Sequence, residues 1–318
     1  MRQGAAKFIR IAPEYLLAED RAIDFDVYTR RDNRDRMILL AAAHSNISAL
    51  KELLRVKQYG PLFITKEDYS RFQRFLEDSL GAVIANPRVP IEKKSALVHA
   101  CARDVLRDVF ADPRSGDTIS RTKKVTGNLV NLTLAHRASI LTLLSLGAHD
   151  YYTFSHCVNV AVFAIGLWQS INPKGEKGLQ DFALGCILHD VGKTQVQDEI
   201  LNKPGKLTPP EFEKIKFHPG HGFTLMEGQI STTSLDVILH HHEKVNGQGY
   251  PHGLSGEQIS DHAKIATIAD VYDALTTNRP YAGARLPFSA LTTMKEEMVG
   301  HFEHDKFNEF ILFLGGKK

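Results

Sequence analysis

Histidine is the residue type in this 318-residue chain whose number and placement most clearly suggest chemistry. Eleven of the fifteen histidines follow Tyr151, and nine of them lie within residues 156–262. Imidazole nitrogens combined with carboxylate oxygens are ligands that suit iron, manganese and zinc ions. This uneven placement suggests a metal centre in the second half of the chain.

One segment gives this suggestion a structural form. Residues 178–190 are predicted to form a helix, because five apolar residues recur there at the spacing of a core-facing stripe. The same face continues to Asp190, and a buried carboxylate is very costly unless it is paired or bound to a metal ion. An ion pair with Lys193 would satisfy Asp190 without a metal. Gly192 is expected to end the helix in a left-handed conformation.

The same geometry recurs on four further helical segments, where a histidine or an aspartate lies at the end of an apolar face or at a helix junction. A single residue of this kind is more often a satisfied core side chain than a ligand. Several of them converging inside a helical bundle form the usual metal centre of all-α proteins. The residues are His156, His218, His241, His242 and Asp270.

The number of candidate ligands indicates more than one metal ion. It exceeds the four ligands of a single structural zinc, so Asp190 is expected to bridge two ions. Two neighbouring divalent cations are the recurrent device for hydrolysing phosphate esters. Residues 151–318 carry a net charge of −4, against +6 for residues 1–150, and bound cations would reverse the sign locally and attract an anion. The pattern predicts a dinuclear hydrolase.

The elements that must position these residues change along the chain. Residues 8–11, 25–29, 37–42 and 62–65 are predicted strands, and residues 48–56 and 65–81 predicted helices. Two prolines mark residues 86–90 as a linker, and the pattern is then helical over residues 91–110, 120–146 and 153–170. The expected fold class is α+β overall. A small mixed α/β domain, residues 1–85, with a regulatory or docking role, precedes an all-α helical bundle, residues 86–318, that includes linking helices over residues 91–146.

Composition argues against several classes. The longest apolar stretches, such as residues 158–168, are shorter than the roughly 20 residues of a membrane span, so no span is predicted. The N-terminal residues lack the apolar core of a signal peptide, and three cysteines do not suggest a disulfide scaffold. We therefore expect a cytoplasmic protein. The positive charge of the first half is too dilute for binding a nucleic-acid polymer.

Several motifs in the second half resemble those of one family. Residues 189–193 (HDVGK) and 241–251 (HHEKVNGQGYP) are similar to the HDxGK and HHExxxGxGYP signatures of the HD-GYP family. Tyr152 and Thr153 before His156 resemble its YTxxH start, and residues 218–222 resemble its HPxxG element. Residues 270–281 resemble its DxxDALTxxRPY segment, so the resemblance covers about residues 151–281 in order.

The resemblance implies an all-α HD-type helical domain and a bacterial phosphodiesterase acting on cyclic di-GMP. It implies hydrolysis by a hydroxide that bridges two divalent metal ions, of which iron is favoured over manganese and zinc. Catalytic roles fall to Asp190, as the bridging ligand, and to Lys193, near the scissile phosphate. Substrate contacts fall to Arg279, Gly249, Tyr250 and Pro251. The implied metal ligands are His156, His189, Asp190, His218, His241, His242 and Asp270.

The resemblance also implies partners, and the sequence departs from the family pattern at three positions. The loop of residues 247–251 is a candidate contact for diguanylate-cyclase domains, and a homodimer is compatible with the sequence. Tyr152 replaces a glutamate that accompanies a third metal, which favours two ions. Asn246 replaces an aspartate, and Ala282 replaces a basic residue for which Arg285 is a candidate substitute. The alternatives are a catalytically weak cyclic-dinucleotide sensor or partner-binding scaffold, and another HD-type hydrolase acting on nucleotides such as ppGpp or dNTPs.

Overall fold

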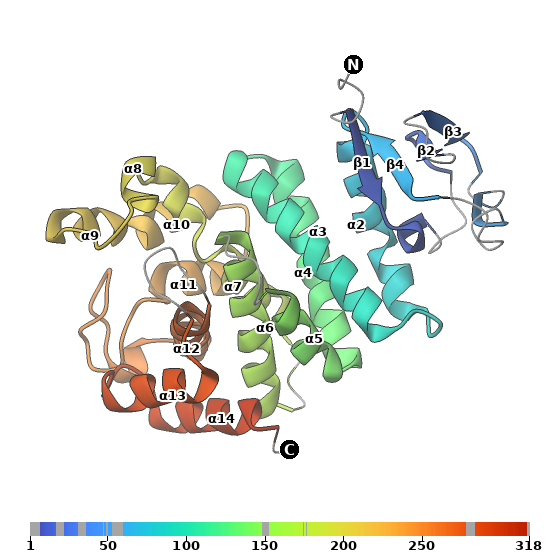
Figure 1. Cartoon of the computed structure of the whole chain (residues 1–318). Helices are drawn as coiled ribbons and strands as arrows, with labels where there is room; N and C mark the ends of the chain where they lie inside the picture. The colour runs from blue at the N-terminus through green and yellow to red at the C-terminus, as the bar shows by residue number, and fades with distance from the viewer. Residues whose placement is uncertain are drawn as a thin grey trace. The chain divides into compact units, whose positions relative to one another are not determined.

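The computed structural model of the chain describes residues 7–16, 22–30, 36–46, 48, 50–52, 60–147, 153–173, 175, 177–277 and 284–316. The chain divides into two compact units, residues 1–97 and 98–318. The division falls within the helix of residues 91–111. The boundary expected from the sequence, between residues 85 and 86, lies before the loop that precedes this helix. The first unit contains a small sheet and the second is helical, which confirms the α+β class (Figure 1).

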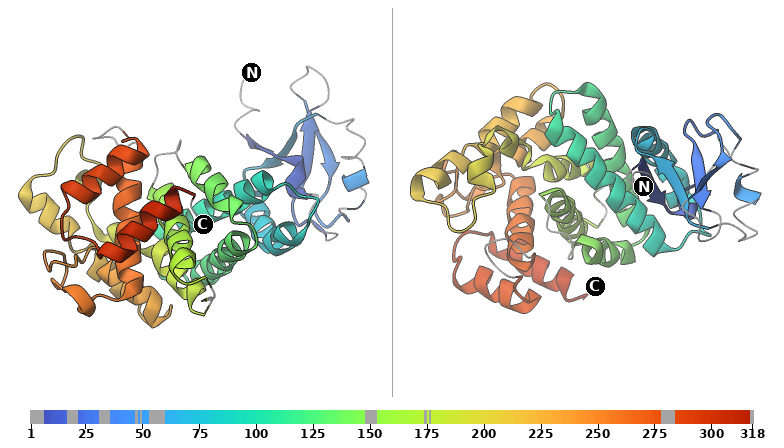
Figure 2. Two further views of the ribbon diagram at one scale, coloured as in Figure 1. Left: turned by 90° about the horizontal axis from the view of Figure 1, so that it is seen from below. Right: turned by 45° about the horizontal axis from the view of Figure 1, so that its top comes forward.

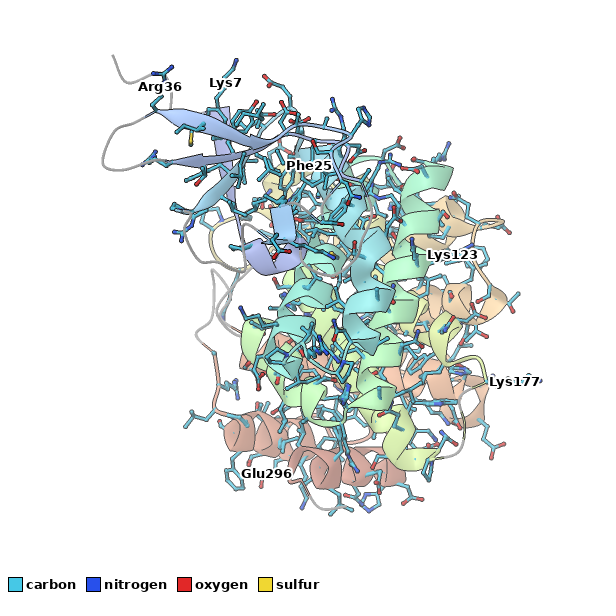
Figure 3. All side chains as sticks on the ribbon, turned by 90° about the vertical axis from the view of Figure 1, so that its right-hand side faces the viewer. Lys7, Phe25, Arg36, Lys123, Lys177 and Glu296 are labelled. Atoms are coloured by element: carbon cyan, nitrogen blue, oxygen red, sulfur yellow. The ribbon has the colours of Figure 1, made fainter. Side chains whose placement is uncertain are left out.

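A four-stranded antiparallel sheet forms the centre of the first unit. Its strands follow the order β1-β4-β2-β3, and the 3-10 helix η2 (Pro13–Leu16) follows β1. Figure 2 shows the sheet and the helix α2 (Tyr69–Ala85) from two further directions. Phe25, labelled in Figure 3, packs edge-to-face against Phe72 and Phe75 of α2. The four strands match the predicted positions closely and are β1 (Phe8–Ile11), β2 (Val27–Arg30), β3 (Met37–Ala41) and β4 (Leu62–Thr65).

The helix after β4 has different ends from those expected. α2 (Tyr69–Ala85) begins after Asp68, which exchanges hydrogen bonds with the hydroxyl of Thr65. It continues through Gly81 to Ala85, because Leu80, Val83 and Ile84 remain buried. Of the helix expected over residues 48–56, residues 48 and 50–52 are helical, and residues 53–59 lie outside the described part.

The second unit is a bundle of helices from the end of α3 to the C-terminal region (Figure 1). The helix expected over residues 120–146 is two helices, because His136 adopts an extended conformation between them. Short 3-10 helices, η3 (Val191–Gln195) and η4 (Gly256–Gln258), complete the unit. Its helices are α3 (Ile91–Ala111), α4 (Gly116–Ala135), α5 (Ala138–Gly147), α6 (Thr153–Ile171), α7 (Leu179–Leu188), α8 (Asp198–Leu201), α9 (Pro209–Ile215), α10 (His218–Met226), α11 (Thr232–His240), α12 (Asp261–Thr276), α13 (Pro287–Glu296) and α14 (His304–Leu314).

α6 is the helix around which the bundle packs. It contacts α5, α7, α12 and α14. By length and composition alone, α6 is long and apolar enough to cross a membrane. The apolar run of residues 158–168 considered in the sequence is shorter and did not indicate this. Within the fold, however, 67% of its most apolar window is buried, as the central helix of a bundle requires.

Candidate metal centre

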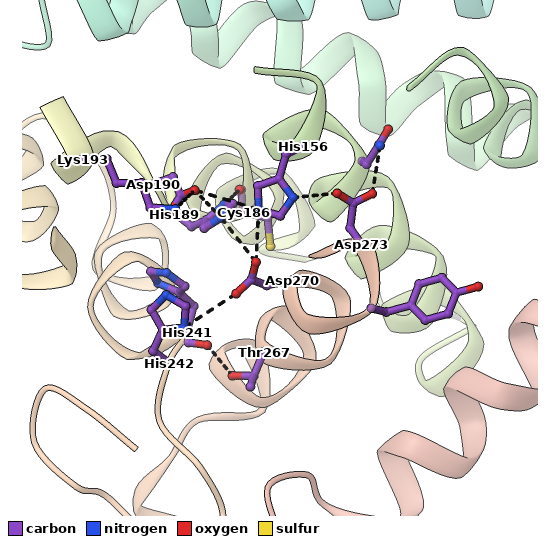
Figure 4. A network of polar contacts seen from close by, with 12 residues as sticks. His156, Cys186, His189, Asp190, Lys193, His241, His242, Thr267, Asp270 and Asp273 are labelled. Atoms are coloured by element: carbon purple, nitrogen blue, oxygen red, sulfur yellow. Dashed lines mark hydrogen bonds and ion pairs between the residues drawn. The ribbon is translucent and has the colours of Figure 1, made fainter. Parts of the chain in front are cut away.

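Five segments of the helical unit bring the candidate ligands together. His156 lies in the first turn of α6, His218 begins α10, and Asp270 lies on α12. The remaining four follow helix ends: His189 and Asp190 follow α7, and His241 and His242 follow α11. Figure 4 shows six of these seven residues converging on one cluster, which we call the histidine–aspartate cluster.

Three histidines of the cluster are oriented by the same backbone contact. In each, Nδ1 lies within hydrogen-bond distance of the carbonyl oxygen three residues earlier. A carbonyl only accepts, so Nδ1 carries the proton and Nε2 is left with a lone pair. The contacts are His189 to Cys186 (2.7 Å), His218 to Ile215 (2.8 Å) and His241 to Ile238 (2.9 Å).

Among the described residues, no donor is recorded that gives a proton to these lone pairs. The Nε2 atoms of His218 and His241 lie 3.2 Å apart, and neither carries a proton to donate to the other. Within the described part of the chain, Nε2 of His189 and Oδ1 of Asp190 are buried without a hydrogen-bond partner. Buried polar atoms of this kind are costly unless something binds them. A cation would satisfy all four atoms, so the donor set fits a metal ion.

Asp190 lies close to two groups of ligand atoms among the described residues, and a third group combines Asp190 with His189 and Cys157. Within each group of three the ligand atoms lie within 4.8 Å of one another. Asp190 Oδ1 is 3.4 Å from His218 Nε2, and Asp190 Oδ2 is 3.5 Å from His189 Nε2. One carboxylate therefore faces the first two groups. These are His218, His241 and His242, and His156, His189 and Asp270.

The protonation states of His218, His242 and Asp190 also suit metal ligation. Burial lowers the pKa of His218 to about 3 and that of His242 to about 4, so these rings are neutral at pH 7. Burial alone would raise the pKa of Asp190, but Lys193 and the neighbouring histidines outweigh it and hold the pKa well below its usual range. Neutral imidazoles and ionised carboxylates are the forms that bind metal ions.

His156 differs in its protonation state. Burial lowers its pKa, but hydrogen bonds to Asp270 and Asp273 outweigh burial and raise the pKa to about 9. A metal ion would therefore have to displace its proton.

Asp273 and Asn159 hold His156 in place, a role that the sequence analysis did not assign. Nδ1 of His156 donates to Asp273 Oδ2 at 2.6 Å (Figure 4). Nδ2 of Asn159 donates to Asp273 Oδ1 at 2.9 Å. Both residues are buried. The position of Asp273 one turn after Asp270 was visible in the sequence, but its contact with α6 depends on helix packing.

Replacing Asp273 by asparagine should weaken metal binding about ten- to a hundredfold, because a carboxylate that orients a histidine ligand also raises its basicity. Titration of the purified protein with Mn²⁺ or Zn²⁺ measures this affinity. Asp305→Asn on the exposed side of α14 is the matched control and should leave it unchanged. Equal affinities for the wild type and Asp273→Asn would contradict the assigned role.

A pocket of about 760 Å³ opens onto the cluster. His218 and His242 of the cluster line this pocket, together with Lys193 and Tyr250. Nζ of Lys193 is 2.6 Å from Asp190 Oδ2, so an ammonium group lies at the point where the pocket meets the cluster. This volume is typical of a small-molecule site. Divalent cations bound in the cluster would allow the pocket to hold an anion.

The loop of residues 247–251 is fixed by Glu243, a second residue that the sequence analysis did not assign. Glu243 is 1% exposed and accepts hydrogen bonds from the backbone N–H groups of His252 (2.7 Å) and Leu254 (3.0 Å). A Cβ atom at Gly249 would collide with the backbone of Glu243 and Lys244. Tyr250 lines the pocket, whereas Gly249 and Pro251 shape the backbone beside it.

Glu243→Gln should lower the free energy of unfolding by about 1–3 kcal/mol, because the amide group of glutamine would oppose one of the two backbone donors. Urea denaturation of the two proteins measures this difference. Glu257→Gln, on the exposed η4 helix of the same region, is the control. Unchanged stability of Glu243→Gln would show that the loop does not depend on this carboxylate.

Two predictions concerning cationic residues have different outcomes. Arg279, the expected phosphate contact, lies outside the described residues. Arg285, the candidate substitute for a basic residue at position 282, donates a hydrogen bond to Thr293 of α13 and is not among the residues that line the pocket. Its guanidinium group is thus bound within the C-terminal helices.

The prediction that Gly192 ends a helix in a left-handed conformation is wrong. α7 ends at Leu188, and Gly192 lies inside η3 without a positive φ angle. A Cβ atom there would overlap the carbonyl oxygen of His218 and lie against the backbone nitrogen of Gly222. Glycine is required because η3 packs directly against the backbone of α10.

The chain is similar to HD domains and to proteins named as cyclic-dinucleotide phosphodiesterases. An HD domain model matches residues 167–305. A cyclic di-GMP phosphodiesterase of Pseudomonas aeruginosa is 36% identical over 235 residues, which are 72% of this chain and 56% of that protein. A 3'3'-cGAMP-specific phosphodiesterase of Vibrio cholerae is 34% identical over 281 residues, 84% of this chain and 61% of that protein. The chain therefore spans less than two thirds of the length of these curated relatives.

A solved structure shares the fold over nearly the whole chain. It is an HDG"Y"P protein from Bdellovibrio bacteriovorus, with a TM-score of 0.69 and 20% sequence identity. The superposition covers 97% of this chain and 100% of that one. At this level of identity the likeness concerns the fold alone.

Proposed function

We propose, from the premise that this chain belongs to the HD-GYP family, that it is a metal-dependent phosphodiesterase acting on a cyclic dinucleotide. The observation that carries the proposal is the histidine–aspartate cluster that borders the pocket. Its buried, unpartnered Nε2 and Oδ1 atoms fit divalent cations, and cations there would bind a phosphodiester that enters the pocket.

The proposed substrate is cyclic di-GMP. Relatives over most of this chain carry names of cyclic di-GMP and 3'3'-cGAMP phosphodiesterases, which support a cyclic dinucleotide and leave its bases to be determined. Neither of the ammonium groups in the pocket, those of Lys193 and Lys206, is buried, so both can meet phosphate oxygens.

We propose two divalent metal ions, with iron favoured and manganese or zinc as alternatives. His218, His241 and His242 would hold one ion, His156, His189 and Asp270 the other, and Asp190 would bind both. When bound, such ions supply an activated water and neutralise charge on the phosphate. Seven nitrogen and carboxylate ligands suit each of these metals.

Lys193 would act on the phosphate that is cleaved. Its Nζ atom keeps Asp190 ionised and also faces the pocket, where it would donate a hydrogen bond to a phosphoryl oxygen. The same ammonium group can deliver a proton to the ribose oxygen that leaves. Tyr250, whose ring centroid is 4.7 Å from that of His242, would form the adjacent wall.

Metal analysis combined with turnover assays tests this proposal. Protein purified without oxygen should contain about two metal ions per chain and hydrolyse cyclic di-GMP. A chain without stoichiometric metal would contradict the mechanism. A preference for ppGpp or a dNTP over cyclic dinucleotides would instead indicate the other HD-type hydrolase class.

The remaining expectations stay predictions. They are a cytoplasmic location, the absence of a membrane span and of nucleic-acid polymer binding, a homodimer, and contact of residues 247–251 with diguanylate-cyclase domains. None of them is needed for the proposed chemistry.

A further inference from the structure

One wall of the pocket carries polar side chains that the proposed mechanism does not use. It is formed by α8 and the residues that follow it, and it includes Asp198 and Asn202. The backbone N–H of Asn202 donates to the carbonyl oxygen of Asp198 at 2.9 Å. The two side chains are therefore one helical turn apart, on the same side of the segment.

These two exposed side chains line the pocket, whereas several charged side chains nearby are paired with one another. Lys203 pairs with Glu211 at 2.6 Å, Lys216 pairs with Glu213 at 2.7 Å, and Lys214 donates to Gln197 at 3.3 Å. In contrast, no hydrogen bond or ion pair within the described residues involves the side chain of Asp198 or of Asn202. Polar groups that line a pocket without internal partners are available to a ligand.

We propose that Asp198 and Asn202 recognise the Watson–Crick edge of a guanine base, which makes α8 the element that selects the substrate. This inference rests on the proposed function. Guanine presents two adjacent donors, N1–H and the N2 amino group, beside the acceptor O6. A carboxylate accepts from both donors, and the amide of Asn202 donates to O6.

Adenine does not complement the same pair. Its N1 atom is an acceptor, and the Asp198 carboxylate would face that lone pair without a proton between them. Such an unpaired contact rejects the wrong base as effectively as a good contact selects the right one. Stacking of a base on Phe212 or Tyr250, which line the same pocket, would not distinguish guanine from adenine.

Asp198→Asn tests the inference directly, because an amide in place of the carboxylate complements adenine and no longer accepts two hydrogen bonds from guanine. Both kcat/KM and Kd are measured for cyclic di-GMP, 3'3'-cGAMP and cyclic di-AMP with the full chain. The wild type should prefer guanine, in that order of substrates. In the variant, the preference for cyclic di-GMP over cyclic di-AMP should fall by at least about tenfold, both in kcat/KM and in Kd. The metal content should be unchanged.

Glu199→Gln is the matched control, since Glu199 is an exposed neighbour on α8 that does not line the pocket. It should keep the wild-type ratio. If the wild type is active and Asp198→Asn keeps the wild-type preference for cyclic di-GMP over cyclic di-AMP, recognition of the base by Asp198 and Asn202 is wrong. The proposed function would then remain intact. If no dinucleotide is hydrolysed, the proposed function fails, and the ratio of Kd values still decides the role of Asp198. Loss of metal from Asp198→Asn would also overturn it.

Discussion

Replacing Asp190 by alanine should remove the metal ions from the purified protein and lower kcat for cyclic di-GMP by at least about a thousandfold. Asp190 is the carboxylate that faces both groups of histidines, and it also holds Lys193 at 2.6 Å. Its loss therefore removes a shared ligand and releases the ammonium group that lines the pocket. Metal analysis and steady-state kinetics measure the two effects.

Asp181→Asn is the control for this prediction. Asp181 belongs to the same helix, α7, but its side chain is exposed at the other end. Metal content and kcat should match the wild type. If Asp190→Ala loses turnover but has the same effect in cells as the wild type, the chain acts through binding or scaffolding. An enzymatic role alone would not account for that effect. Retained metal and retained kcat would contradict the shared-ligand role outright.

Gly192→Ala should destabilise the protein by about 3 kcal/mol and also reduce turnover, although it adds a single methyl group. The added Cβ atom would meet the backbone of His218 and Gly222 rather than a movable side chain, so η3 and α10 must separate. η3 carries Lys193 and α10 begins with His218, so this separation displaces both residues from Asp190. Urea denaturation and kcat measure the two consequences.

Gly220→Ala, two residues after the start of α10, provides a direct comparison. A Cβ atom at Gly220 meets nothing within 4 Å, so this substitution should leave stability unchanged or raise it by less than about 1 kcal/mol. Similar stabilities for the two variants would show that η3 and α10 are less tightly packed than the structure indicates.

The sequence predicted the cluster because helical periodicity reports which side chains share a buried face. Asp190 continues the apolar stripe of α7, and His242 continues that of α11, so the residue pattern alone places both of them at a core. The four strands were also predictable, since each short apolar run is bounded by turn residues.

Contacts between segments distant in the chain could not be predicted in the same way. Asp273 reaches His156 across 117 positions, and Gly192 meets α10 through backbone atoms that leave no periodic signal. The break at His136 between α4 and α5 was missed because neither glycine nor proline marks it. Glu243 was visible within its motif, but the two hydrogen bonds that it accepts from backbone N–H groups depend on the conformation of the following loop.

The backbone contacts of His189, His218 and His241 have a consequence for the evolution of this site. Each imidazole is oriented by a main-chain oxygen, so the side chains of Cys186, Ile215 and Ile238 contribute nothing to that contact. These positions can drift among residues that fill the same space, and the tautomer of each ligand is inherited with the helical backbone. Natural or designed substitutions in the core around this centre can therefore leave the orientation of three of its imidazole rings unchanged.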